Sequence, residues 1–171
     1  DKGWIKAHKP EIRTGKTIAV VGSGPSGLAA AQQLNRAGHL VTVFERDSKI
    51  GGLLRYGIPD FKLEKQVIDR RVKVLEQEGI VFKTNTNVGE DVSVETLRSD
   101  FDVILLCGGA TAKRSLPIKG ADLKGVVQAM DFLKLNNEYV DGLKNFKEVI
   151  SAKDKNVVII GGGDTGSDCI G

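Results

Sequence analysis

Short apolar runs alternate with longer amphipathic segments along the first two thirds of the chain. The run at 18–21 is typical of a strand that is buried on both faces of a parallel sheet, and the runs at 41–44 and 80–83 are expected to be further strands. Between them, the segment 62–79 carries its apolar residues on one helical face and ends at Gly79. This order predicts an α/β fold in which helices cover a parallel sheet.

Further elements are expected toward the C-terminus. We expect a brief helix at 93–99 with Ser93 as its N-cap, and a buried strand at 101–110 that runs into a glycine turn. A helix is expected near 128–136. Residues 156–160 are apolar and β-branched, and we expect them to pair with the open edge of the preceding strand, in this chain or in a neighbour's.

A G-x-G-x-x-G motif lies between the first strand and the first helix. Its first glycine allows a tight turn, its second lets the backbone approach a pyrophosphate, and its third permits close packing of helix on strand. The helix N-terminus then offers N–H donors to the phosphates. We therefore expect a dinucleotide to bind at Gly22, Gly24, Pro25, Ser26 and Gly27.

The acidic residue Glu45 ends the second strand, about 20 residues after the glycine motif, as in dinucleotide-binding folds. Its carboxylate can accept hydrogen bonds from both ribose hydroxyls of an adenosine, and it would repel the 2′-phosphate of NADP. Arg46 follows and is a candidate to cover the adenine. The pair Gly51-Gly52 and the turn "LLCGGA" at 105–110 favour FAD, because many flavoproteins with two dinucleotide-binding domains share this arrangement.

The composition is that of an ordinary globular protein. The 171 residues are 40% hydrophobic and 27% charged, with no apolar run long enough for a membrane span and no signal-peptide pattern. Cys107 and Cys169 form no C-x-x-C pair, so no metal site is expected and two free thiols in a reducing cytoplasm are favoured. The whole net charge of +3 comes from residues 1–16. This segment is either a solvated arm or a contact with an acidic partner or neighbouring domain, and no nucleic-acid motif accompanies it.

Three segments carry a resemblance to a known family: "GKTIAVVGSGPSGLAAAQQLNRAGHLVTVFER", "IGGLLRYGIPDFKL" and "VVIIGGGDTGSDCIG". They resemble the small (β) subunits of NADPH-dependent glutamate synthase. Sequences similar to "GGLLRYGIP" also occur in the electron-entry part of dihydropyrimidine dehydrogenase and in NADPH:ferredoxin oxidoreductase subunits, so these two classes of protein remain alternatives. A nucleotide-binding module without redox activity is a third interpretation, from another class.

The resemblance implies a Rossmann-like FAD/NAD(P)-binding fold of the glutathione-reductase type, present here as a truncated piece. In that family NADPH reduces FAD, and electrons pass through iron–sulfur clusters, held in an N-terminal domain outside this chain, to a large (α) subunit that makes glutamate from glutamine and 2-oxoglutarate. No acid or base residue is expected to be catalytic, because hydride transfer is cofactor chemistry. We expect a cytoplasmic oxidoreductase that contacts neither membrane nor nucleic acid.

The resemblance also assigns residues and domains. FAD contacts are expected at Gly52, Leu53, Arg55, Lys62 and Val88. The NADPH pyrophosphate is expected at a second, incomplete motif made of Gly161, Gly162, Gly163, Asp164, Thr165 and Gly166. The expected domains are a basic arm (1–16), the first FAD-domain segment (17–112), a connecting region (113–152) and the start of the NADPH domain (153–171). Such a fragment is expected to be inactive alone.

Overall fold

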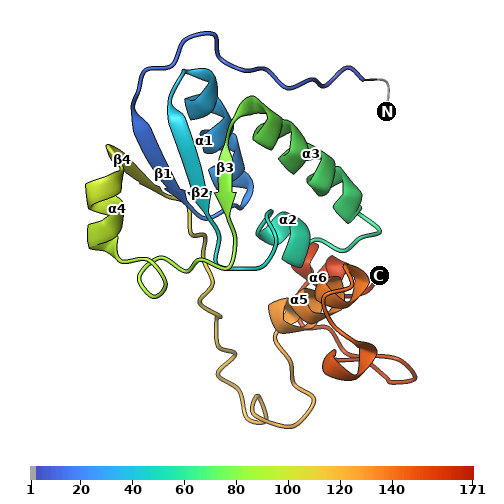
Figure 1. The fold of residues 1–171 in the computed structure, drawn as a ribbon. Helices are drawn as coiled ribbons and strands as arrows, with labels where there is room; N and C mark the ends of the chain where they lie inside the picture. Colours follow the sequence, from blue (N-terminus) through green and yellow to red (C-terminus); the bar gives the residue numbers. More distant parts are fainter. Residues whose placement is uncertain (1–2) are drawn as a thin grey trace. The chain divides into compact units, whose positions relative to one another are not determined.

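The computed structural model describes residues 3–171, which form two compact units. Unit 1 contains Asp1–Arg55 and Gln66–Gly109, and unit 2 contains Tyr56–Lys65 and Ala110–Gly171 (Figure 1). The two glycine motifs therefore lie in different units, and each unit is described separately.

Unit 1 is built on a four-stranded sheet in which all neighbouring strands are parallel (Figure 1). The register places Val20 opposite Val43 on one side and opposite Leu105 on the other. This confirms the parallel α/β fold expected from the pattern of apolar runs. The strand order is β3-β2-β1-β4, with bounds β1 Thr17–Val21, β2 Leu40–Phe44, β3 Val81–Lys83 and β4 Val103–Leu106.

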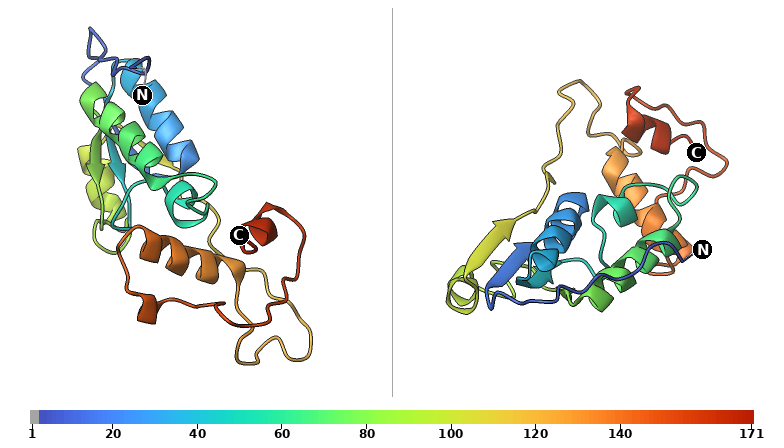
Figure 2. Two further views of the ribbon diagram at one scale, coloured as in Figure 1. Left: turned by 90° about the vertical axis from the view of Figure 1, so that its right-hand side faces the viewer. Right: turned by 90° about the horizontal axis from the view of Figure 1, so that it is seen from above.

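Helices cover both faces of this sheet. The helices α1 (Pro25–Arg36) and α3 (Lys65–Glu78) lie side by side on one face, as the left view of Figure 2 shows. The helix α4 (Val94–Asp100) packs on the other face through Leu97. Because side chains alternate along a strand, Ile18 and Val20 of β1 point into the first layer and Ala19 into the second. Both faces of the central strands are therefore buried.

Local signals in the sequence set the helix ends. The Ser93 hydroxyl accepts a hydrogen bond from the Thr96 N–H at 3.0 Å, which confirms Ser93 as the N-cap of α4. The helix α1 ends before Gly38, which has φ +97°, and the N–H of His39 returns to the carbonyl of Leu34 at 3.1 Å. Glycine suits this position because the left-handed region carries little steric penalty without a Cβ.

A buried carboxylate joins α3 to α1 and to the N-terminal segment. Glu78, at the end of α3, is fully buried and accepts hydrogen bonds from Arg36 at 2.8 Å, Gln32 at 3.1 Å and the backbone N–H of His8 at 3.1 Å. Burial alone would raise the pKa of Glu78, but the hydrogen bonds from Arg36, Gln32 and His8 outweigh it, so that this pKa is lowered. The polar network replaces the water that the carboxylate loses.

Arg13 and Lys16, two basic residues of the N-terminal segment, have side-chain partners inside unit 1. Arg13 donates to the Asn35 side chain at 2.8 Å and to the carbonyl of His39 at 2.7 Å. Lys16 pairs with Asp102 at 2.9 Å. The part of the segment nearest β1 is therefore held against the unit by hydrogen bonds, rather than being a wholly solvated arm.

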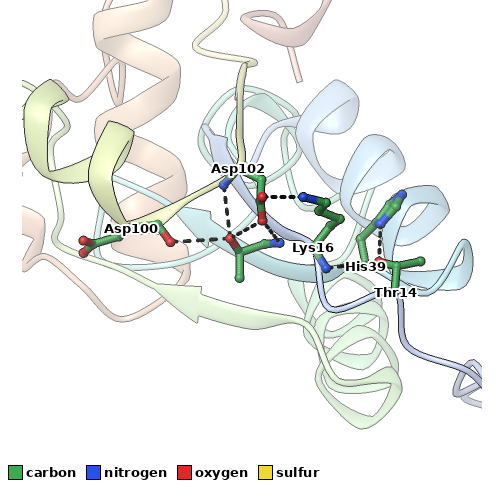
Figure 3. Close-up of polar contacts among 6 residues, drawn as sticks. Thr14, Lys16, His39, Asp100 and Asp102 are labelled. Atoms are coloured by element: carbon green, nitrogen blue, oxygen red, sulfur yellow. Dashed lines mark hydrogen bonds and ion pairs between the residues drawn. The ribbon is translucent and has the colours of Figure 1, made fainter.

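The side chain of Asp102 joins the start of β4 to the start of β1 (Figure 3). Its carboxylate accepts from the Thr17 N–H at 2.9 Å, from the Thr17 hydroxyl at 3.0 Å and from Lys16 at 2.9 Å. The Asp102 N–H in turn donates to the Thr17 carbonyl at 3.0 Å. The hydrogen bonds from Lys16 and Thr17 lower the pKa of Asp102 to about 2. These contacts fix the register in which Ile18 lies opposite Val103.

One expectation for the apolar runs is wrong, and a second is not met within unit 2. The strand β4 is not buried: Val103 is 51% exposed and Leu106 is 76% exposed, because β1 is its only neighbour among the described residues. Residues 156–160 form no strand among the described residues of unit 2. Their pairing with the edge of β4, in this chain or in a neighbour's, stays a prediction. An apolar, β-branched run becomes a strand only where a neighbour satisfies its backbone groups, and the described part of unit 2 supplies none.

Unit 2 consists of helices and loops. The helix α5 (Ala129–Val140) extends four residues past the expected end, and α6 (Asp164–Asp168) follows the second glycine motif; η1 (Phe146–Glu148) is a single 3₁₀ turn. Asn137 of α5 is buried and donates to the carbonyls of Tyr56 at 3.2 Å and Gly57 at 3.3 Å. This contact holds the segment "YGIP" against α5. Within residues 3–171, no helix is long and apolar enough to span a membrane.

Candidate functional site

The first glycine loop lies at the edge of the sheet where the parallel strands end. The loop precedes the short α2 (Leu53–Tyr56) in sequence, and backbone hydrogen bonds hold it between its neighbours. The N–H of Gly22 donates to the Phe44 carbonyl at 2.8 Å, and the N–H of Cys107 donates to the Val21 carbonyl at 2.7 Å. In parallel α/β sheets, ligands bind outside this carboxyl edge.

The third glycine of the loop is required by its surroundings. A Cβ on Gly27 would lie 2.0 Å from the carbonyl oxygen of Gly22, a distance that real structures do not show. A Cβ on Gly24 would meet nothing within 4 Å. Gly24 is the N-cap of α1, Pro25 is the first helical residue and Ser26 is exposed. The loop therefore packs closely on its inner side and leaves open space at its second glycine.

The carboxylate of Glu45 is positioned at the same edge. It is only 5% exposed and accepts hydrogen bonds from the N–H of Ser23 at 3.1 Å, from the hydroxyl of Ser23 at 2.5 Å and from the N–H of Asp47 at 2.9 Å. A ribose bound here would share these oxygens with the protein donors. The structure thus places Glu45 next to the glycine loop, as a ribose-binding role requires.

Ser23 is a residue that the sequence analysis missed. It occupies a variable position of the motif, and its side chain is fully buried. Its hydroxyl donates to Glu45 and also accepts from the N–H of Gly51 at 3.0 Å. No signal in a single sequence distinguishes such a serine from any small residue at that position.

The Gly51-Gly52 pair passes directly over the glycine loop. Gly52 has φ +52°, and a Cβ there would lie 2.8 Å from the Cα of Gly24. Leu53, which follows, is mostly exposed. The structure thus brings together the glycine loop, Glu45 and the Gly-Gly turn, which the sequence places up to 30 residues apart.

Three further residues with a predicted FAD contact have different surroundings from one another: Arg46, Arg55 and Val88. Arg46 is exposed, as a residue over an adenine can be. Arg55 is 2% exposed, pairs with Asp69 of α3 and donates to the Ile50 carbonyl at 2.8 Å. A phosphate contact by Arg55 stays a prediction and would require its side chain to leave Asp69. Val88 is half-buried and forms a β-bridge with Val92.

The second glycine motif, in unit 2, repeats the local geometry of the first. A Cβ on Gly166 would lie 2.6 Å from the carbonyl oxygen of Gly161, and Gly163 is the N-cap of the following helix, α6. The N–H of Ser167 donates to the Gly163 carbonyl at 3.0 Å, as that of Leu28 does to Gly24 at 2.9 Å. Gly162 and Gly163 face open space, and Asp164 and Thr165 open α6. Two loops of one type are therefore present.

Lys62 lies beside this second motif in unit 2 and pairs with Asp168, the last residue of α6. The contact of Lys62 with FAD stays a prediction. The neighbouring Cys169 is a free thiol whose pKa is raised by burial and by the negative charge of Asp168. A raised pKa makes a thiol a poorer nucleophile at neutral pH, so this cysteine has no sign of redox activation.

A pocket of about 480 Å³ opens on unit 1 between α4 and β4. Its lining is mostly apolar and includes Leu97, Phe101 and Ile104, together with the charged Arg98 and Asp102. No glycine of the first loop lines it. We place the functional site at the glycine loop and not in this pocket, because the loop has the polar groups that a dinucleotide needs. In the described part of the chain, no cluster of three or more His, Cys, Asp or Glu side chains could hold a metal ion.

Comparison with known proteins identifies the type of domain. The family model described as pyridine nucleotide-disulphide oxidoreductase matches residues 16–171. Among relatives, the glutamate synthase [NADPH] small chain of Mycobacterium tuberculosis is 58% identical over the whole of this chain, and that of Bacillus subtilis is 54% identical over 99% of it. The chain spans 36% and 35% of these two relatives, so about a third of their length.

A solved structure supports the same conclusion. FprA of Mycobacterium tuberculosis, determined in complex with NADPH, is 30% identical and superimposes with a TM-score of 0.66. The match covers 75% of this chain and 31% of FprA. The fold expected from the sequence, a FAD/NAD(P)-binding oxidoreductase domain with a parallel sheet, is confirmed.

Proposed function

The chain belongs to the pyridine nucleotide-disulphide oxidoreductase family, and from this premise we propose that it is the electron-input flavoprotein module of an NADPH-dependent glutamate synthase. The observation that carries the proposal is the convergence of the glycine loop, Glu45 and the Gly51-Gly52 turn at one edge of the sheet. These are the groups that an adenine dinucleotide needs.

FAD binds in unit 1. Gly24 and the N-terminus of α1 would hold its pyrophosphate, because the space at Gly24 is open and the helix directs N–H groups and a partial positive charge outward. The ribose hydroxyls of its adenosine donate to Glu45, whose negative charge disfavours a 2′-phosphate at this loop. The Gly51-Gly52 turn lies against the loop, where a Cβ on Gly52 would lie 2.8 Å from the Cα of Gly24.

NADPH binds at the second glycine loop, with its pyrophosphate near Gly163 to Thr165. The support is the local geometry that this loop shares with the first one and the NADPH named for the glutamate synthase relatives and for the FprA complex. The chemistry that the two cofactors would supply is hydride transfer from NADPH to the flavin, and the electrons would be delivered singly, through iron–sulfur clusters, to a large subunit that makes glutamate from glutamine and 2-oxoglutarate. This chain's residues bind and orient the two nucleotides.

The large subunit is the proposed partner, on the evidence of the small-chain relatives. The cytoplasm is the proposed location, because two free cysteines suit a reducing compartment. The iron–sulfur clusters are proposed for residues outside this chain.

Anaerobic mixing of the FAD-loaded full-length protein with NADPH tests the proposal. We expect the flavin absorbance to bleach as NADPH is oxidised, at a rate that rises with NADPH concentration and saturates. The 171-residue chain alone is expected to show no NADPH-dependent dye reduction. A full-length protein that holds FAD but is not reduced by NADPH or NADH would contradict the redox function and favour a nucleotide-binding module without redox activity.

A further inference from the structure

We propose that Ser23 is a positioning residue of the FAD site, and that its hydroxyl sets the direction of the Glu45 carboxylate toward the adenosine ribose. This inference rests on the proposed function and adds a residue to it. The hydroxyl joins three segments that belong to the site: the glycine loop, the end of β2 and the Gly51-Gly52 turn.

The geometry of the hydroxyl fits this role. Its oxygen lies 2.5 Å from Oε2 of Glu45, to which it donates, and 3.0 Å from the N–H of Gly51, from which it accepts. The backbone N–H of Ser23 donates to the same Oε2 at 3.1 Å. One carboxylate oxygen is therefore fixed by two donors from a single residue.

The second carboxylate oxygen completes the orientation. Oε1 of Glu45 accepts from the N–H of Asp47 at 2.9 Å. A carboxylate has about four acceptor positions, and three protein donors already point at this one. The plane of the carboxylate is therefore set by the protein, and the part that remains available for a ribose hydroxyl is set with it.

The hydrogen bond between Ser23 and Glu45 is buried, so its loss is not readily compensated by water. Ser23 is fully buried and Glu45 is 5% exposed, so water does not replace a lost hydroxyl freely. Without the Ser23 hydroxyl, Oε2 of Glu45 loses its shortest hydrogen bond and the N–H of Gly51 loses its acceptor. Both groups are then freer to move, and the site is no longer preorganised for the nucleotide.

The test compares FAD affinity, by titration of flavin fluorescence, in the protein, in Ser23→Ala and in Glu45→Gln. We expect Ser23→Ala to weaken FAD binding about tenfold, the effect of one buried hydrogen bond to a charged group. Ser99→Ala is the matched control, because Ser99 is an exposed hydroxyl of the same unit with bonds only to Thr96 and Asp100. Its FAD affinity should equal that of the unaltered protein.

The double variant Ser23→Ala/Glu45→Gln tests whether Ser23 affects FAD affinity by positioning Glu45 or only by supporting the fold. If Ser23 acts through Glu45, removing its hydroxyl costs little further affinity once the carboxylate is gone, so the two effects are not additive. Equal fold losses in both backgrounds would overturn the inference, because a structural role alone does not depend on the carboxylate. Should Ser23→Ala fail to fold by circular dichroism, Ser23→Cys replaces it in the same cycle, since the thiol is similar in shape and a weak donor.

The outcomes also distinguish the inference from the proposed function. Equal FAD affinity of Ser23→Ala and the unaltered protein would overturn the role of Ser23 and leave the proposed function standing. An unaltered protein that binds no FAD would contradict the proposed function and, with it, the role given to Ser23.

Discussion

A Cβ atom on Gly27 would lie 2.0 Å from the carbonyl oxygen of Gly22, across the loop that joins β1 to α1. This contact fixes how closely the first turn of α1 approaches the end of β1. The second loop has the corresponding contact, with 2.6 Å between a Cβ on Gly166 and the carbonyl oxygen of Gly161. The third glycine of each motif is thus set by packing inside the loop, before any ligand is considered.

Gly27→Ala is therefore expected to destabilise unit 1. The added methyl group must displace the backbone of Gly22 or the start of α1, and overpacking of this kind costs about 3 kcal/mol of unfolding free energy. Urea unfolding followed by circular dichroism measures the change. A Gly27→Ala variant as stable as the unaltered protein would show that the loop is looser than the structure indicates.

Gly24→Ala should behave differently. A methyl group at Gly24 meets no atom within 4 Å, so we expect the free energy of unfolding to change by less than about 1 kcal/mol, mostly through the poorer N-cap. The same methyl group occupies the space proposed for the pyrophosphate, so FAD affinity should fall at least about tenfold, from lost hydrogen bonds to a charged group. Flavin fluorescence titration beside urea unfolding gives both quantities. Unchanged FAD affinity in a folded variant would place the pyrophosphate elsewhere.

Acid should weaken the contact between β4 and β1 through Asp102. Its pKa is lowered from 3.8 to about 2 by Lys16 and Thr17, so its carboxylate contributes stability that is fully present above about pH 4. That contribution is lost as the pH falls from 3.8 toward 2, because protonation then favours the unfolded chain.

Asp102→Asn should remove this part of the pH dependence. The melting temperature of the variant, measured across the same pH range, should fall less steeply than that of the unaltered protein. Asp100→Asn is the control, since Asp100 accepts only from Ser99 through its side chain. An identical pH profile for Asp102→Asn and the unaltered protein would contradict the role of Asp102.

Glu78→Ala should loosen α3 from α1. The substitution leaves the buried amide of Gln32 and the N–H of His8 without their acceptor, and we expect a loss of about 2–3 kcal/mol in unfolding free energy. Glu76→Ala is the matched control, because Glu76 is exposed on the same helix. Equal stabilities of the two variants, measured by urea unfolding, would show that the network around Glu78 contributes little.

The parallel sheet and the glycine loop could be predicted because their signals are local. The apolar runs of β1 and β2, the motif at 22–27 and the cap at Ser93 each depend on residues a few positions apart. The domain bounds and the nucleotide contacts are not tested by the structure and stay predictions.

Contacts between distant segments could not be predicted in the same way. The pairing of Arg55 with Asp69, and of Lys62 with Asp168, depends on where the chain folds back, and a basic residue near a glycine motif suggests a phosphate equally well. The run at 156–160 has the composition of a strand but no neighbour among the described residues of its unit. An apolar, β-branched composition favours a strand, but the segment forms one only where a partner strand is available.

The most direct test of an FAD site at the first glycine loop is the absorbance spectrum of the protein after incubation with FAD and removal of free flavin by desalting. We expect flavin bands to be retained by the unaltered protein and lost or much reduced when Gly24 is replaced by valine, with the fold unchanged by circular dichroism. A folded, unaltered protein that keeps no flavin, or a Gly24→Val variant that keeps as much as the unaltered protein, would contradict an FAD site at this glycine loop.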